Sequence, residues 1–297
     1  MGRSLVHLAV LSAIWSSPFV FIKIGVETVP PLTMTVGRVV LASFVLYAFL
    51  RLRRQTLPGG GRLWGMFLGL AVLGNALPFT LIAWGEERID SGLAAILMAV
   101  MPLATVILTH FFTRDERAGV LKVLGVTIGL AGVAFLVGTE ALRGLGGDVW
   151  RQLAVAGAAL SYAAAATLAR RLPPLSPVVR TTAVMVCGCL VIIPLALIFE
   201  RPWMLSPSPE GVLSIVYLGL VPTAVGTILY FRLISDTGAT FVSFVNYLIP
   251  VLGVLWGFLF LDERVSIQAL VSMAAILAGI AIATLQLRRV KPPTGYP

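Results

Sequence analysis

Apolar residues along this chain gather in long uninterrupted runs and do not alternate with polar ones. A run of about twenty apolar residues, bounded by charge, proline or glycine, is long enough for a helix to cross a bilayer. Ten such runs occur, at 5–24, 32–50, 63–84, 92–112, 119–138, 152–170, 177–199, 211–232, 238–260 and 266–287. The pattern therefore predicts an all-α membrane protein with ten transmembrane helices joined by short loops.

One stretch of the pattern occurs twice. Residues 91–132 and 237–279 both begin with a hydroxyl residue and a glycine, and both pass through the tripeptide Asp-Glu-Arg, at 115–117 and 262–264. The tripeptides lie 147 residues apart, about half the chain. Because five helices per copy is an odd number, the second copy must enter the membrane inverted. We predict a first repeat in 1–138, a linker loop in 139–151, a second repeat in 152–287 and a cytoplasmic tail in 288–297.

The composition agrees with a membrane protein and excludes other classes. Hydrophobic residues make up 58% of the chain and charged residues 12%, about half the charged share of a soluble domain. The net charge of +9 comes from short loops, which is typical of membrane topology and not of nucleic-acid binding. The first run could be a signal peptide, but no small-residue cleavage site follows it. Cys187 and Cys189 indicate neither a disulfide nor a metal site, and we expect no cofactor.

The distribution of Lys and Arg predicts the orientation. With the N-terminus in the cytoplasm, fifteen of these residues fall in inner segments and six in outer segments. Since cytoplasmic loops carry the excess of positive charge, both termini are expected inside.

Several motifs resemble a known family. Ala13-Ile14-Trp15, Val29-Pro30-Pro31 and then Arg38 look like the start of an EamA-type member of the drug/metabolite transporter superfamily, and so do the two stretches that end in Asp-Glu-Arg. The resemblance implies a bacterial inner-membrane exporter of small metabolites, similar to the amino acid exporters and among them the aromatic amino acid exporters. The second half departs from the pattern, with Tyr162 in the place of Trp15 and Val184 near the place of Arg38.

Polar, aromatic and sulfur-containing side chains near the middle of the runs are expected to line a cavity between the halves. The predicted substrate-binding residues are Trp15, Phe19, Arg38, Asn75, Phe79, Met98, Met101, Tyr162, Thr223 and Asn246. Structural roles are open for each kind. The asparagines can hydrogen-bond a neighbouring helix, worth about 0.6–2 kcal/mol, and the rings can pack or face lipid. The arginine can reach the outer headgroups instead of a substrate carboxylate.

Five prolines interrupt the runs and are expected to bend the helices, as static kinks or as hinges whose free carbonyls help hold an ammonium group. They are Pro18, Pro78, Pro102, Pro222 and Pro250. The Asp-Glu-Arg tripeptides are expected to cap the helix that follows each of them, with a gating role as the alternative. Small residues at Gly125, Gly129, Gly132, Ala275 and Gly279 predict close helix packing in the fifth and tenth runs.

No Asp or Glu lies deep in a run, because Glu27, Glu86, Glu87 and Glu200 fall at or beyond the ends. We therefore hypothesise weak or absent proton coupling. A neutral or aromatic amino acid needs only one carboxylate partner, and it is the expected substrate. Drugs or quaternary cations, held by aromatic faces, are the alternative. A lipid-modifying enzyme would need paired carboxylates at one membrane face, so no enzyme is expected. The expected partners are the substrate and the lipid bilayer, and a monomer is compatible with the sequence.

Overall fold

The structure is a computed structural model that describes residues 2–112, 120–142 and 148–285. Every regular element in these residues is helical. Seven helical segments are long and apolar enough to cross a membrane, and three shorter apolar helices cover 120–136, 245–261 and 267–283. The ten runs of the sequence thus correspond to ten apolar helical segments, and the crossing of the membrane by all ten remains a prediction. The tail at 288–297 and the first Asp-Glu-Arg tripeptide lie outside the described residues.

The helices of the first half follow one another with short connections. They are α1 (Gly2–Ser16), α2 (Pro18–Gly25), α3 (Pro31–Leu52), α4 (Gly61–Ala71), the π-helical η1 (Val72–Ala76), α5 (Leu77–Glu86), α6 (Ser91–Met98), α7 (Val100–Phe112) and α8 (Val120–Leu142). The second half contains α9 (Val149–Ala169), α10 (Pro177–Phe199), the 3₁₀ turn η2 (Pro202–Met204), α11 (Pro209–Leu218), the π-helical η3 (Gly219–Val225), α12 (Gly226–Thr237), α13 (Ala239–Val242), α14 (Val245–Leu261) and α15 (Ile267–Leu285).

The helix interruptions lie beside the prolines. Pro18 opens α2, Pro78 follows η1, Pro102 lies just after the break between α6 and α7, Pro222 lies inside η3, and Pro250 follows the break between α13 and α14. A proline lacks an N–H and its ring collides with the carbonyl four residues earlier, so a helix loses one main-chain hydrogen bond at each of them. The bending of the helices at these prolines stays a prediction.

The two π-helical segments begin 147 residues apart, at Val72 and Gly219, which is the offset between the Asp-Glu-Arg tripeptides. The duplication read from the sequence therefore extends to an uncommon backbone feature. Single π-helical turns inside α-helices are frequent at functional sites. The third helical segment of each half is therefore a candidate for part of such a site.

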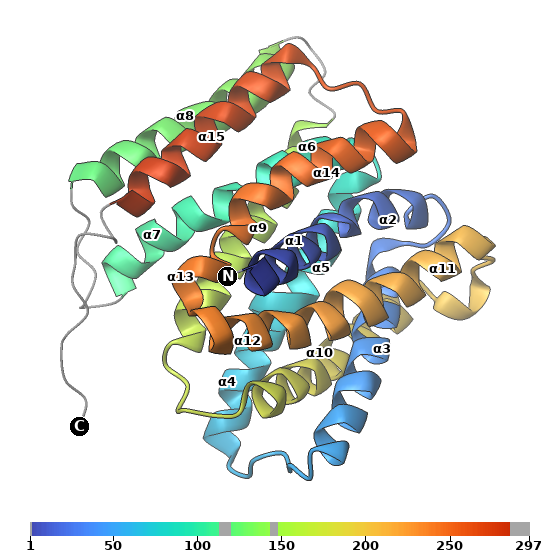
Figure 1. The fold of residues 1–297 in the computed structure, drawn as a ribbon. Helices are drawn as coiled ribbons and strands as arrows, with labels where there is room; N and C mark the ends of the chain where they lie inside the picture. The colour runs from blue at the N-terminus through green and yellow to red at the C-terminus, as the bar shows by residue number, and fades with distance from the viewer. Residues whose placement is uncertain (1, 113–119, 143–147, 286–297) are drawn as a thin grey trace, which may run out of the picture.

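Equivalent helices of the two halves pack against each other. Helix α3 packs on α10, α6 on α14, and α8 on α15 (Figure 1). The pair formed by α8 and α15 lies along one edge of the bundle in Figure 1. There a Cβ added to Gly125 would lie 2.4 Å from the Gly279 carbonyl oxygen, so only glycine permits the observed approach. The predicted small-residue packing of these two helices is confirmed.

Candidate functional site

The two ends of the bundle differ in their polar contacts. One end, which we call the clamped face, carries the loops at 26–30, 87–90, 200–208 and 262–266, and several hydrogen bonds cross it from one half to the other. The opposite end, which we call the cavity face, carries the loops at 53–60 and 170–176. Among the described contacts there, the Ser176 hydroxyl donates to the Gln55 side-chain oxygen over 3.0 Å.

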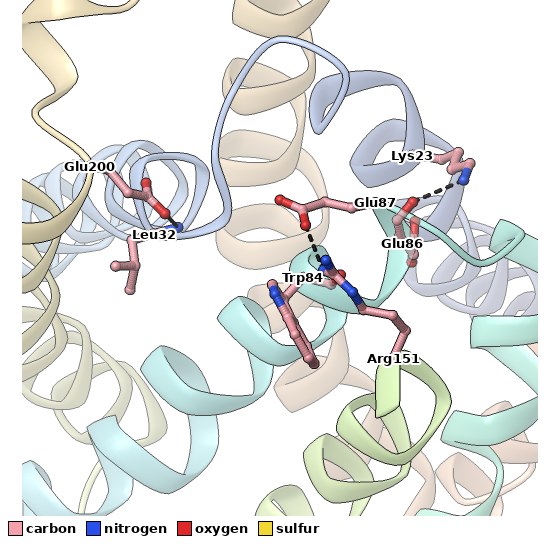
Figure 2. A network of polar contacts seen from close by, with 7 residues as sticks. All are labelled: Lys23, Leu32, Trp84, Glu86, Glu87, Arg151 and Glu200. Atoms are coloured by element: carbon pink, nitrogen blue, oxygen red, sulfur yellow. Dashed lines mark hydrogen bonds and ion pairs between the residues drawn. The ribbon is translucent and has the colours of Figure 1, made fainter. Parts of the chain in front are cut away.

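An arginine joins the halves at the clamped face. Arg151, in the first turn of α9, forms an ion pair of 2.5 Å with Glu87 just after α5. The same guanidinium donates to the Trp84 carbonyl and lies 3.9 Å from the centroid of the Trp84 ring. Figure 2 shows Arg151 reaching up from α9 to both partners. A planar guanidinium can make these contacts together, which a lysine could not.

Two carboxylates bind the first turn of a helix in the other half. Glu200 accepts from the main-chain N–H groups of Leu32 and Thr33 at 2.9 and 2.7 Å (Figure 2). Glu263 accepts from the N–H groups of Ser91 and Gly92 at 2.7 and 2.9 Å and from the Ser91 hydroxyl at 3.0 Å. Helix N-termini carry unsatisfied donors and a positive dipole end, and both carboxylates match this chemistry.

The contact of Glu263 corrects an expectation from the sequence. The second Asp-Glu-Arg tripeptide was expected to cap the helix that follows it, but Glu263 caps α6, which belongs to the first half. Asp262 adopts a left-handed backbone conformation with φ of 53° that ends α14 and turns the chain back. This turn lets the next side chain reach across the interface instead of along its own chain.

Glu86 lies at the end of its span, as expected, because it is the last residue of α5. Its burial was not predicted: it is 0% exposed, and neither carboxylate oxygen has a hydrogen-bond partner among the described residues. The nearby Lys23 ammonium donates to the main-chain oxygens of Glu86 and Ile89 at 2.9 and 2.8 Å (Figure 2). A buried acid therefore lies at the end of α5, although none was expected deep in a run, and weak proton coupling remains a hypothesis.

A polar and aromatic cluster lies in the interior between the halves. The buried Arg38 of α3 donates through Nε to the Thr223 hydroxyl of η3 over 2.8 Å. Its guanidinium carbon lies 3.6 Å from the centroid of the Phe79 ring. Phe79 in turn contacts the Tyr162 ring edge-on, at 6.4 Å between centroids. Four of the predicted site residues, which we call the central cluster, are thus brought together from α3, α5, α9 and η3.

Side chains occupy carbonyls that the helix interruptions release. The Thr223 hydroxyl donates to the Leu218 carbonyl at 2.6 Å, and the Ser161 hydroxyl to the Leu73 carbonyl at 2.7 Å. The Trp15 indole N–H donates to the Pro222 carbonyl over 3.1 Å. These three carbonyls already have donors, which favours static kinks over ammonium-binding hinges at these places.

A cavity of about 290 Å³ lies at the junction of the halves. It extends from Ala169 and Arg180, at the cavity face, to Asn75 and Tyr162 in the helix interiors. Asn75 and Tyr162 were predicted from the sequence. Other lining residues were not, and these include Arg180, Thr181, Met185 and Thr227. Arg180 was counted only among the cations of the inner segments, although it falls inside the predicted run 177–199 and lies at the first turn of α10.

The remaining predicted residues lie outside this cavity lining. Phe19 is buried in the main hydrophobic core, and Met98 packs against that core. Met101 and Asn246 are half-buried on α7 and α14, and the Trp15 ring packs against the Tyr230 ring in a tilted arrangement with 4.9 Å between centroids. A second hollow of about 470 Å³, lined by Arg3, Ser4, His7, Arg232 and Asp236, lies at the ends of α1 and α12, away from the central cluster.

This arrangement of repeats around a central polar cluster defines a class of protein, the membrane transporters built from a duplicated helical bundle. Comparison with known proteins agrees. Residues 3–138 and 149–285 each match the EamA-like transporter family, so the chain belongs to that family, within the drug/metabolite transporter superfamily. The resemblance read from the sequence is confirmed.

Curated relatives cover nearly the whole chain. The chain is 24% identical to the "Uncharacterized transporter YoaV" of Bacillus subtilis, over 98% of this chain and 100% of that protein. It is 29% identical to the "Uncharacterized inner membrane transporter YedA" of Escherichia coli, over 94% and 89%. Protein PagO of Salmonella typhimurium is 28% identical over 82% of this chain and 80% of its own length. A crystal structure with a TM-score of 0.68 and 20% identity covers 98% of this chain and all of the other, and supports the fold.

Proposed function

We propose that the protein exports neutral and aromatic amino acids and related small metabolites by alternating access. The observation that carries the proposal is the cavity between the halves, whose lining extends to one end of the bundle while polar contacts close the other. Its volume of about 290 Å³ is at the small end of ligand sites, which span roughly 300–1,000 Å³. A single small metabolite fits such a volume.

The chemistry of the cavity favours a substrate with a carboxylate. Arg180 lies at its mouth, and Arg38 lies behind Tyr162 and Phe79 at its inner end. Asn75, Thr181 and Thr227 supply neutral hydrogen-bonding groups, and Met185 with the alanines of α9 supplies an apolar wall. The described lining contains no acid, so a quaternary cation would meet repulsion from Arg180, and of the lining residues only the Tyr162 ring could offer it a cation–π contact. A zwitterion with an apolar side chain satisfies each kind of group.

From the distribution of Lys and Arg, we assign the cavity face to the cytoplasmic side of the membrane and the clamped face to the outer side. In this assignment, the structure is an inward-open conformation. Inverted repeats can exchange shapes, so the outward-open conformation would break the clamp and close the cavity face.

Counterflow in proteoliposomes tests the substrate class. Vesicles loaded with one unlabelled amino acid are diluted into a trace of the same radiolabelled compound, and the panel covers aromatic, aliphatic, acidic and basic amino acids and a quaternary ammonium. We expect transient accumulation for the aromatic and aliphatic members. Accumulation of the quaternary ammonium alone would overturn the proposal.

A further inference from the structure

Glu86 is the feature of the interior that the proposed transport cycle does not yet use. It is the last residue of α5, its side chain is fully buried, and both carboxylate oxygens are without a hydrogen-bond donor among the described residues. Three other carboxylates of the clamped face have bonding partners. Glu87 pairs with Arg151, and Glu200 and Glu263 each bind a helix N-terminus.

An ionised carboxylate in such a place is costly, because burial removes its water and no donor replaces it. The charged groups that face Glu86 are Lys23 on α2, Arg38 on α3 and Glu263 in the loop after α14. None of them bonds the carboxylate oxygens of Glu86. Lys23 donates to main-chain carbonyls, Arg38 donates to Thr223, and the negative charge of Glu263 repels that of Glu86. Asp90 lies in the adjacent loop, where partial burial and then Glu263 raise its pKa.

We propose that Glu86 is the proton-binding residue of this transporter and that the clamped face closes only when Glu86 carries a proton. In the open arrangement water reaches Glu86 and the carboxylate is ionised. A proton from the water on that side binds one carboxylate oxygen, and closing then buries a neutral acid. The clamped face thus opens more as the pH rises. The inference rests on the proposed alternation between two conformations and needs no knowledge of the substrate.

The test measures exposure of a cysteine that the clamp buries. Val29 is 1% exposed and packs beside Gly211 of the other half. We therefore place Val29→Cys in a background with Cys187→Ala and Cys189→Ala. The protein is reconstituted in lipid nanodiscs, where both faces meet the same buffer, and it is labelled with a charged maleimide. The pH is varied between about pH 5 and about pH 8, a range that lies above the ordinary pKa of a glutamate side chain. The readout is the ratio of the labelling rate in this parent protein to that in the same protein with Glu86→Gln, because the ratio cancels the pH dependence of thiol reactivity.

We expect a ratio near one at the acidic end that rises about fivefold or more at the basic end, as ionisation shifts the parent toward the open arrangement. Glu86→Asp should keep the pH dependence. Glu27→Gln, the same change at an exposed site on the same face, should leave the rate at the parent value throughout. A ratio that stays constant with pH would overturn the proposal, and so would an equal effect of Glu27→Gln.

If the Glu86→Gln protein does not fold, a second reference protein replaces it. The parent rate is then divided by that of a protein with its cysteine on the exposed turn, at Glu27→Cys, and a ratio that does not change with pH again contradicts the role of Glu86. Failure here is separable from failure of the substrate proposal. A flat ratio with intact counterflow removes only the proton site, whereas a rising ratio without amino acid counterflow removes only the substrate class.

Discussion

At the scale of single residues, the interior site depends on one guanidinium with two different contacts. Arg38 uses its Nε to bind Thr223 and its planar face to cover Phe79. The first contact is directional and the second is electrostatic and dispersive, and the planar guanidinium makes both at once. The residue therefore holds α3, α5 and η3 in one arrangement beside the cavity.

Arg38→Lys should keep the charge but make only one of the two contacts at a time. We expect a loss of about 1–2 kcal/mol in these interactions and a fall of about tenfold in the initial rate of substrate counterflow. Arg53→Lys, the same change at an exposed position just after α3, is the control and should transport normally. Equal rates in the two variants would show that the central cluster has no part in transport.

Glu86 shows where prediction from the sequence stops at this scale. Its neighbours Glu87 and Arg88 place it in an ordinary charged loop by composition. Its burial arises because α2 and Lys23 cover it from a distance of about sixty residues along the chain. By contrast, Asn75 and Tyr162 were found from their depth in an apolar run, because depth is set by the position within the run alone.

At the scale of helices, the apolar runs and the prolines predicted the elements well, since run length and a missing N–H are local properties. The π-helical form of η1 and η3 was not predicted, because it follows from how the broken turns satisfy their carbonyls against other helices. The cross-half contact of Glu263 was missed for a similar reason, as the tripeptide itself does not indicate which N-terminus it meets.

The contact between α8 and α15 allows a test of helix packing. In Gly125→Ala the new methyl group would lie 2.4 Å from a carbonyl oxygen and 2.6 Å from the Ala283 nitrogen, so the helices must separate. We expect a destabilisation of about 1–3 kcal/mol, measured by thermal unfolding in detergent. Gly65→Ala on α4, where an added Cβ has nothing within 4 Å, should be neutral or slightly stabilising. An unchanged Gly125→Ala protein would mean that these helices do not pack this closely.

At the scale of the whole molecule, the inverted duplication is what makes alternating access possible. The family matches and the helix pairs support two copies, but their opposite insertion is a prediction from the odd number of runs. Gly59 and Ser206 provide a direct test because they are 147 residues apart, exposed, and in equivalent loops of the two halves.

Single cysteines at Gly59→Cys and Ser206→Cys, in the background without Cys187 and Cys189, should label from opposite sides of the membrane. We expect an impermeant maleimide added to intact cells to modify the cysteine at 206 and to reach the one at 59 only after permeabilisation. Labelling of both from the same side would contradict the inverted arrangement and with it the proposed mechanism.

Two acids of the clamped face, the buried Glu86 and the ion-paired Glu87, have no acidic counterparts at the related positions of the second half. The residues 147 positions after Glu86 and Glu87 are Leu233 and Ile234. When the opposite end shuts, apolar side chains would therefore stand at two positions where this end has acids. Dissolved ions weaken contacts between charges, whereas cooling weakens contacts between apolar groups. Closure of the clamped face would then respond mainly to ionic strength, and closure of the opposite end mainly to temperature.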